Sequence, residues 1–513
     1  MIVVYHSIVK VDEVIFFDGE QIPFDTRDSI AFVLSKLAKQ FSSETIVWCN
    51  SVFKQDLQVA SITTEFHHAK MMLSYNPSDL DFLGDDLGYI EEFLYLNINR
   101  NISYPTWRMS SAVGVIHASV LLELENKIAK DTNFEYYLNS LAKLCMPLGL
   151  LCYSEPKLLN GLRVAVSNKS NFFTLFRFVK QHYKAVWVYL LLLNLFLYER
   201  KFPIVPFLFA FFFKRRSATG IDLECLAVAS SKKVVTQGTV DVLIPTIGRK
   251  AYLYDFLLDL KQQTILPSSV IIVEQNPVLG STSELAYLKD ESWPFEIKHT
   301  FIHQTGACNA RNIALQQITS EWVFFADDDI RIDRTFIEDT FKQITAYGIQ
   351  AVSVQSHHPN AKPIDSVIKQ WHTFGGGSSF VASERLKGCS FPLAYEFGFG
   401  EDFDFGVQLR SKGYDILYFP NPLILHLKAP MGGFRTKQVF KWQDASIQPK
   451  PSPTVMLYFI KNYSKQQLNG YKTTLFFKYF KFQKIRNPLM YYKNFKKQWE
   501  QSIYWANELR KIV

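Results

Sequence analysis

Cysteine is scarce in this sequence, and no two cysteines are closely spaced. The six cysteines lie far apart along 513 residues, and none belongs to a CxxC pair. This distribution argues against a zinc ribbon and a disulfide framework, and it is typical of a reducing compartment. The first residues, MIVVYHSIVKVDEV, also lack the basic start and sustained apolar stretch of a secretion signal. We therefore expect a cytoplasmic protein.

The sequence also lacks an apolar run as long as a membrane-spanning helix. Its two most apolar runs, residues 186–198 and 202–213, are separated by Glu199, Arg200 and Lys201. Each is shorter than the ~20 residues that a spanning helix needs. Two interpretations of 186–213 remain open: buried helices that link domains, or a hairpin that dips into the membrane interface.

Acidic residues are scarce in the last part of the chain. From Lys428 to Val513 there are 17 Lys and Arg but three acidic residues, so this segment carries +14 and the remainder −6 of the total +8. Residues 471–499 interleave basic residues with Phe and Tyr, which suits peripheral contact with an anionic membrane. The alternatives are a helix packed on the rest of the protein and a single-stranded nucleic acid site. Nucleic acid is not expected, because no nucleic-acid module is recognisable.

Four segments differ in composition. Residues 1–165 mix short apolar runs with helical patterns, 166–235 are very apolar and aromatic, 238–430 alternate strand and helix patterns, and 431–513 form the basic tail. Because 48% of all residues are apolar, the chain can bury a large core. We expect an α/β N-terminal domain, an apolar aromatic helical linker, an α/β catalytic domain and a basic aromatic helical tail.

The pattern in 238–430 predicts a mostly parallel sheet. The short apolar runs at 240–244, 270–273 and 322–325 are typical of buried strands, and helical patterns separate them. Alternation of this kind implies βαβ units with right-handed crossovers. Ligands of such sheets bind beyond the carboxyl ends of the strands.

Three polar signals stand at these strand ends: Pro245, Glu274 and the aspartates 327–329. Adjacent carboxylates repel one another, and a bound divalent cation would offset this repulsion. Asp327 and Asp329 point to the same side of an extended segment, and Mg²⁺ and Mn²⁺ prefer such oxygen ligands. The alternative is an acidic turn at the end of a strand.

A second acidic group, Glu401, Asp402 and Asp404, follows a glycine and leads into a predicted helix. A carboxylate there is suited to act as a general base on a hydroxyl. The alternative is a solvated helix cap, which explains one of the three acids. Downstream, His426 follows another apolar run and is either structural or an imidazole ligand of a metal.

Seven motifs occur in one order along the chain. They are VDVLIPTIGR, VIIVEQN, GACNARNIAL, WVFFADDDI, GGGSSFV, GEDFDFGVQLRSKGYDILYFP and ILH. Each motif alone is weak, but together they resemble a family 2 glycosyltransferase with the GT-A fold over about residues 238–430. The resemblance implies an α/β domain with a mostly parallel, Rossmann-like sheet.

The resemblance also implies a role for each matching residue. Asp402 would be the catalytic base, with Glu401 beside it in the acceptor site. Asp327, Asp329 and His426 would hold Mg²⁺ or Mn²⁺. The residues that would bind the nucleotide sugar are Pro245, Thr246, Arg249, Glu274, Arg311, Asp327, Asp328, Gly376, Gly377 and Ser378. Two departures from the family pattern are Gln408, where members often carry Arg, and Glu274–Gln275, where paired aspartates are common.

The function implied is inverting transfer of a sugar from a nucleotide-sugar donor to a hydroxyl of a glycan or lipid-linked acceptor. Cell-surface polysaccharide assembly at the inner face of the membrane would suit such an enzyme. One alternative is a sugar nucleotidyltransferase, although PTIGRKAY is a poor version of its Gly-rich loop. The other is a non-catalytic glycan-binding scaffold, which the intact acidic residues disfavour.

The N-terminal third contains short stretches with weak sequence similarity to residues 238–430. Residues 133–159 align with 398–425 through Phe134 and Tyr153, which would place Tyr136–Tyr137 at the positions of Glu401 and Asp402. Cys49–Asn50 would then stand where the aspartates begin. One hypothesis is a degenerate, non-catalytic GT-A-like copy without metal ligands or base. The alternative is chance similarity between apolar patterns.

Overall fold

The computed structural model describes residues 1–78, 80–91, 99–161, 169–361, 366–429 and 439–512. The chain forms two compact units, Met1–Ser231 with Tyr463–Lys481 and Lys232–Asn462 with Phe482–Val513. The apolar segment 166–235 therefore folds almost entirely within the first unit, and the basic tail is shared by both. The expected boundary near 165 and the start of the tail at 431–438 lie outside the described residues.

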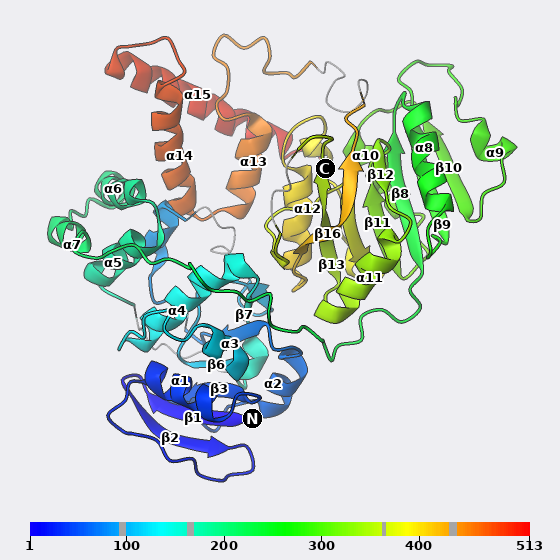
Figure 1. Ribbon diagram of the computed structural model, residues 1–513. Coiled ribbons are helices and arrows are strands. Elements are labelled where there is room, and N and C mark those ends of the chain that lie inside the picture. The colour runs from blue at the N-terminus through cyan, green and yellow to red at the C-terminus, as the bar shows by residue number, and fades with distance from the viewer. Residues whose placement is uncertain (79, 92–98, 162–168, 362–365, 430–438, 513) are drawn as a thin grey trace. The chain divides into compact units, whose positions relative to one another are not determined.

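The first unit is built on a mixed sheet (Figure 1) with the strand order β2-β1-β3-β6-β4-β7-β5. Its strands are β1 (Ile2–Ser7), β2 (Lys10–Phe16), β3 (Thr45–Asn50), β4 (Met71–Tyr75), β5 (Tyr104–Pro105), β6 (Val113–His117) and β7 (Leu151–Ser154). Its helices are α1 (Ile30–Gln40), α2 (Val59–Glu65), α3 (Ala118–Glu123), α4 (Phe134–Cys145), α5 (Phe172–His182), α6 (Ala185–Asn194), α7 (Ile204–Ala210) and α14 (Lys465–Phe480).

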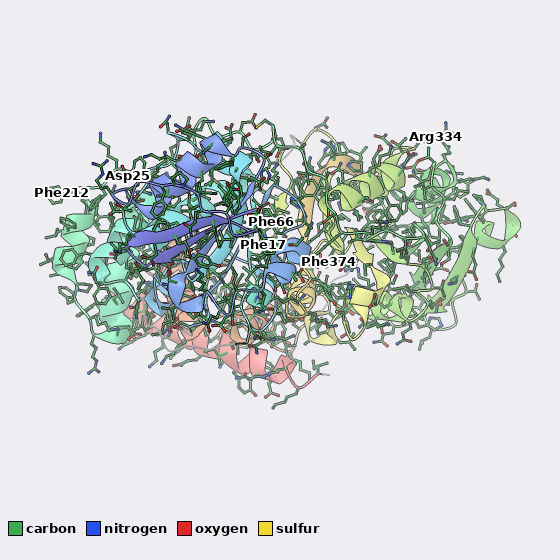
Figure 2. All side chains as sticks on the ribbon, turned by 90° about the horizontal axis from the view of Figure 1, so that it is seen from below. Phe17, Asp25, Phe66, Phe212, Arg334 and Phe374 are labelled. Atoms are coloured by element: carbon green, nitrogen blue, oxygen red, sulfur yellow. The ribbon has the colours of Figure 1, made fainter. Side chains whose placement is uncertain are left out.

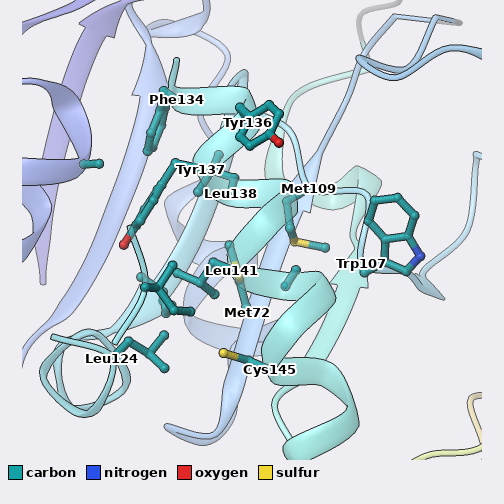
Figure 3. Packing of buried hydrophobic residues seen from close by; sticks show 14 of the residues in the cluster. Met72, Trp107, Met109, Leu124, Phe134, Tyr136, Tyr137, Leu138, Leu141 and Cys145 are labelled. Carbon is teal, nitrogen blue, oxygen red and sulfur yellow. The ribbon is translucent and has the colours of Figure 1, made fainter. Parts of the chain in front are cut away.

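Helix α4 shows how the sequence directs the packing of this unit. The Asn133 side chain accepts a hydrogen bond from the Tyr136 N–H at 2.9 Å and so caps the start of the helix. Phe134, Tyr136 and Tyr137 are then buried in the core, together with Leu138 and residues from neighbouring elements (Figure 3). The two tyrosines therefore belong to the apolar core.

The apolar segment forms α5, α6 and α7 with one buried side. Val188 and Leu191 are fully buried, whereas Val205 is 66% and Phe212 83% exposed, and Phe212 projects at the edge of the ribbon in Figure 2. The buried side agrees with packed helices, and contact of the exposed side with a membrane interface stays a prediction. Among the described residues, no helix combines the length and hydropathy needed to cross a membrane.

The second unit is built on a larger sheet with the order β10-β9-β8-β11-β15-β13-β16-β12, and β14 pairs with β16. Its strands are β8 (Val240–Thr246), β9 (Ser269–Gln275), β10 (Glu296–Ile302), β11 (Trp322–Ala326), β12 (Ile330–Ile332), β13 (Ala351–His357), β14 (Lys369–Gln370), β15 (Ser378–Ala382) and β16 (Leu417–His426). Its helices are α8 (Lys250–Lys261), α9 (Tyr287–Asp290), α10 (Ala307–Leu315), α11 (Phe336–Tyr347), α12 (Glu401–Arg410), α13 (Pro453–Asn462) and α15 (Pro488–Leu509).

The predicted parallel sheet is present. Strands β10, β9, β8 and β11 are all parallel, and β15 then pairs antiparallel with β11. The apolar run in β11 is fully buried, as expected for a central strand covered on both faces. The rings of Phe374 and Phe405 pack against the ring of Phe325 in this strand. Phe374 is labelled in Figure 2.

The two sheets share a central arrangement of five strands. In the first unit the order is β1-β3-β6-β4-β7, and in the second it is β8-β11-β15-β13-β16. The successive pairings are parallel, antiparallel, antiparallel and parallel in both units. The corresponding strands of the two units also occur in the same order along the chain. This agreement supports the hypothesis of a repeated fold.

Candidate functional site

The candidate site lies where β8 and β11 end. These neighbouring strands are parallel, with Leu243 paired to Phe325, so the residues that follow both strands reach the same edge of the sheet. A pocket opens there, and half of the fourteen residues expected from the sequence line it: Pro245, Thr246, Arg249, Arg311, Asp327, Asp328 and Glu401.

Asp328 holds the loop after β8 in place. It is 2% exposed, and its carboxylate accepts hydrogen bonds from Thr246 Oγ1 at 2.7 Å and from an Arg249 guanidinium nitrogen at 2.6 Å. Burial raises the pKa of Asp328 to about 6, although Arg249 acts in the opposite direction. Because both of its oxygens are engaged, Asp328 fixes the pocket wall formed by Thr246 and Arg249.

Asp329 meets His426 because of strand register. Strand β12 pairs antiparallel with β16 so that Ile330 lies opposite His426, and His426 Nε2 is then 3.1 Å from Asp329 Oδ1. Ala429 N–H also donates to Asp329 at 2.8 Å. Burial disfavours the charged form of Asp329, but these hydrogen bonds outweigh it and lower its pKa to about 2.

Asp327, Asp329 and His426 form a cluster in which one ligand atom from each residue lies within 4.8 Å of the others. Two carboxylates and an imidazole are a donor set that suits Mn²⁺ or Mg²⁺ with further oxygen ligands from a diphosphate. Asp329 is 1% exposed and held by hydrogen bonds, while the Asp327 side chain is 35% exposed. The cluster therefore combines a fixed carboxylate with an open one.

Arg311 connects the aspartates to the second acidic group. It lies on α10, is 6% exposed, and its guanidinium group stacks over the Phe391 ring at 5.3 Å. One terminal nitrogen lies 3.4 Å from Asp327 Oδ1 and the other 3.7 Å from Asp402 Oδ1. A buried, always charged group thus stands between the two carboxylates.

Residues Gly376 and Gly377 pass close to the same carboxylates. In the β11–β15 pairing Ala326 lies opposite Ser378, which brings Gly377 against Asp327. A Cβ atom at Gly377 would overlap the Asp327 carboxylate, and one at Gly376 would overlap Asp402 and Arg311. Glycine is therefore required at both positions by close approach of the backbone.

Replacing Gly377 with Ala should displace Asp327 and lower kcat/KM by about 100-fold, because small misplacements near the reacting groups have large effects on rate. Initial rates with a nucleotide-sugar donor test this expectation. The melting temperature should fall by only a few degrees, since the displaced side chain is partly exposed. A variant with unchanged activity would show that Asp327 has freedom to move without consequence.

The first turn of α12 carries three acids with different environments. Asp402 receives a hydrogen bond from the Gly376 N–H, and burial raises its pKa, with Arg311 opposing the shift. Burial and the neighbouring Asp402 charge also raise the pKa of Glu401. Two carboxyl groups with raised pKa values therefore follow one another at the start of α12, and Glu401 lines the pocket.

Asp404 has a structural role. It is fully buried and pairs with Lys461 Nζ of α13 at 2.7 and 2.9 Å. Gln408 Nε2 donates to Asp404 at 2.9 Å and to the Ser390 carbonyl at 2.9 Å. At this departure from the family pattern, the Gln408 amide thus joins Asp404 to Ser390, and Lys461 supplies a positive charge beside Asp404.

The side chain of Glu274 is directed away from the pocket. It accepts hydrogen bonds from Ser283 Oγ at 2.5 Å and from the Glu284 N–H at 3.0 Å, and it pairs with His299 at 2.9 Å. The next residue, Gln275, lines the pocket instead and accepts from the Gly306 N–H at 2.6 Å. The alternation of side chains along β9 accounts for the difference of one position.

Glu396 is a pocket residue that sequence analysis missed. Its carboxylate accepts from the N–H groups of Cys308 and Asn309 at 3.1 and 2.9 Å and so caps the start of α10. It lies 88 and 87 residues from Cys308 and Asn309 in sequence, and no local pattern links it to that helix. This cap fixes the helix that carries Arg311.

Residues 241–391 match the sequence model of the family described as Glycosyl transferase family 2. The resemblance stated from the motifs is confirmed, as is an α/β fold of GT-A type with a helical C-terminal region. A search of curated proteins found no match.

Three solved structures are similar to parts of this chain at low sequence identity. S. aureus TarS is 17% identical, with 37% of each chain covered and a TM-score of 0.32. S. aureus TarS 1–349 in complex with UDP-GlcNAc is 16% identical, with 54% of this chain and 84% of that chain covered and a TM-score of 0.37. GalNAc-T7 with UDP, GalNAc and Mn²⁺ is 13% identical, with 43% and 47% covered and a TM-score of 0.34. The match thus spans little more than a third of TarS.

Proposed function

We propose that the family 2 domain is an inverting glycosyltransferase. It would move a sugar from a nucleotide-sugar donor to a hydroxyl of a glycan or lipid-linked acceptor, in the assembly of a cell-surface polysaccharide. The observation that carries this proposal is the placement of Asp402 and Asp327 on either side of Arg311, beside a pocket at the carboxyl edge of the sheet.

Asp402 is the general base in this proposal. It removes the proton of the acceptor hydroxyl, whose oxygen then forms a bond to the anomeric carbon while the bond from that carbon to the diphosphate oxygen breaks. The proton stays on Asp402, and the diphosphate leaves with the bonding electrons. The Gly376 N–H orients the carboxylate, and Arg311 places positive charge between donor and base.

Residues at the carboxyl ends of β8 and β9, with Arg249 of the loop after β8, hold the nucleotide. Pro245, Thr246 and Arg249 form one wall, fixed by Asp328, and Gln275 takes the position expected for Glu274. Asp327, Asp329 and His426 would hold Mg²⁺ or Mn²⁺, which when bound offsets the negative charge of a departing diphosphate.

Product analysis distinguishes the three functional classes. The purified full chain is incubated with Mn²⁺, a panel of nucleotide sugars and a mixture of saccharide acceptors. Release of nucleoside diphosphate, with inversion at the anomeric carbon of the product by NMR, supports the transferase. Pyrophosphate release supports a nucleotidyltransferase, and binding of saccharides without turnover supports a scaffold.

A second part of the proposal concerns the membrane. In the first unit, the α6–α7 surface exposes Phe202, Val205, Leu208 and Phe212, which are each at least 57% exposed. Exposed basic residues, Lys201, Lys214 and Arg215, flank this segment in the sequence. Apolar side chains flanked by positive charge fit the interface of an anionic bilayer. We propose that this surface, with residues 471–480 of α14, attaches the protein to the inner face of the membrane.

A double variant with Ser in place of both Leu208 and Phe212 should bind at least tenfold more weakly to vesicles that contain 30% anionic lipid. The reason is that each apolar side chain buried in the membrane contributes about 1.5–3 kcal/mol to the free energy of binding. Flotation of the full chain with vesicles measures the effect. Leu279→Ser is the matched control, because Leu279 is 84% exposed on the second unit. Equal flotation of all three proteins would remove this surface as the attachment site.

A further inference from the structure

The first unit has its own pocket at the carboxyl ends of β3 and β4. Asn50 is the last residue of β3, Asn76 follows β4, Ser111 precedes β6 and Glu135 is the second residue of α4, and all four line the pocket. Glu135 Oε1 accepts hydrogen bonds from the Ser111 N–H at 3.0 Å and from Ser111 Oγ at 2.9 Å. Its Oε2 atom is buried and has no hydrogen-bond partner within the described part of the chain.

Strand pairing relates this pocket to the candidate site of the second unit. The last pair of β3 and β6 joins Cys49 to Val113, and the last pair of β11 and β15 joins Ala326 to Ser378. Asn50, the residue after Cys49, therefore stands where Asp327 stands in the second unit.

The loops before β6 and β15 make corresponding hydrogen bonds. The Ser110 N–H donates to Ser74 Oγ of β4 at 3.1 Å, and the Gly375 N–H donates to Ser353 Oγ of β13 at 3.2 Å. In each loop the next N–H donates to a carboxylate in the first turn of a helix, Glu135 in one unit and Asp402 in the other.

These contacts correct the alignment inferred from the sequence. Glu135, and not Tyr136 or Tyr137, occupies the position of Asp402, and both tyrosines lie in the core. The first unit therefore keeps a carboxylate at the position of Asp402, whereas Asn50, Ser51 and Val52 replace the three aspartates. The one cluster of metal-binding side chains found among the described residues lies in the second unit.

The nucleotide half of the sheet is not repeated. In the second unit β8 is followed by α8, β9 and β10, whose loops form the wall proposed to hold the nucleotide. Between β1 and α1, where every residue is described, the first unit has only the hairpin strand β2. What remains in common is the half of the sheet that, under the proposed function, faces the sugar and the acceptor.

The charges in the pocket favour a neutral ligand. Arg108 lines the pocket and pairs with Asp81 at 2.9 Å, and Asp81 also pairs with Arg100 at 2.7 Å. The cations are thus engaged by a carboxylate and not directed at a phosphate. Amide, hydroxyl and carboxylate groups beside Phe53 and Phe82 offer donors, acceptors and apolar faces, which is what hydroxyl groups and C–H faces of a sugar require.

We propose that the first unit is a divergent copy of the GT-A fold that binds a neutral saccharide between Asn50 and Glu135, without a metal and without a nucleotide. Only the choice of a sugar rests on the proposed function of the second unit. The copy holds a saccharide and does not transfer one.

Saturation-transfer-difference NMR of the full chain tests this site. The sample contains EDTA, no nucleotide, and the methyl glycosides of glucose, galactose, N-acetylglucosamine, N-acetylgalactosamine and rhamnose. Signal transfer to at least one glycoside is expected, and it should persist in Asp327→Asn/Asp402→Asn. Because this experiment does not measure donor turnover, its result does not depend on the proposed transferase activity.

Two variants from different elements keep the test independent of folding. Glu135→Gln preserves the shape of the side chain. Asn50→Asp preserves the oxygen that accepts the hydrogen bond from the Val52 N–H. Each variant should weaken the saturation-transfer signal at least tenfold. Glu20→Gln, an exposed acid of the same unit, should leave it unchanged. Transfer to none of the glycosides, or transfer lost in the second-unit variant and kept in Glu135→Gln, would overturn the proposal.

Discussion

Replacing Asp402 with Asn should lower the transfer rate by about 100- to 10,000-fold, the range that a general base contributes. The amide keeps the shape of the carboxylate and its hydrogen bond from the Gly376 N–H, so donor binding should change little. Nucleoside diphosphate release at saturating donor and acceptor measures the rate, and a thermal shift with Mn²⁺ and the donor measures binding.

Glu384→Gln is the matched control for this variant, because it also removes one negative charge from the second unit but at an exposed position. It should retain the wild-type rate. If Asp402→Asn also retained it, the base would have to be another group, and neighbouring Glu401 would be the first to examine.

The same residue predicts a pH profile. Burial raises the pKa of Asp402 above its ordinary value of 3.8, with Arg311 opposing the shift. A protonated carboxyl group cannot accept the acceptor's proton, so kcat/KM should fall as the pH drops through this raised pKa. We expect the acid limb of the profile above pH 3.8, measured between pH 4 and 8, and we expect Asp402→Asn to lack it.

Replacing Asp327 with Asn should remove the open ligand of the metal cluster and lower kcat/KM by at least 100-fold. Asp327 is the exposed member of the cluster, whereas Asp329 is buried and hydrogen-bonded by His426 and Ala429. The change should therefore affect Mn²⁺ binding more than folding. Titration of Mn²⁺ in the presence of a nucleoside diphosphate, followed by EPR, gives the affinity.

Asp339→Asn serves as the control for charge, since Asp339 lies on the solvent side of α11. It should bind Mn²⁺ as the wild type does. Addition of EDTA to the wild type should reproduce the loss seen in Asp327→Asn, and excess Mn²⁺ should restore only the wild type. Full activity in EDTA would show that the reaction does not need the metal.

The sequence predicted the features that depend on local pattern. The apolar runs before Pro245 and Asp327 mark strands, and parallel strands must end at a common edge, so the convergence of these residues follows from their spacing. The fully buried run in β11 explains why three aspartates can follow it: Asp328 and Asp329 are each satisfied by groups from other strands and loops.

The sequence did not predict features that depend on pairing across distance. Glu396 caps α10, and Lys461 neutralises Asp404 from a helix of the tail. Neither contact has a local pattern. The choice of Gln275 over Glu274 depends on the phase of one strand, and a shift of one residue exchanges its two faces. The alignment that paired Tyr136 with Glu401 had another cause: it matched aromatic residues and so placed the start of α4 two residues from the position that the Glu135 and Asp402 contacts give.

The proposed mechanism requires one cation held by Asp327, Asp329 and His426 beside a bound diphosphate. Crystals of the full chain grown with Mn²⁺ and a nucleoside diphosphate, measured near the manganese absorption edge, test this directly. We expect an anomalous peak within bonding distance of Asp327 and the diphosphate, with the nucleotide between Thr246 and Gln275. A nucleotide bound elsewhere, or a peak outside this cluster, would contradict it.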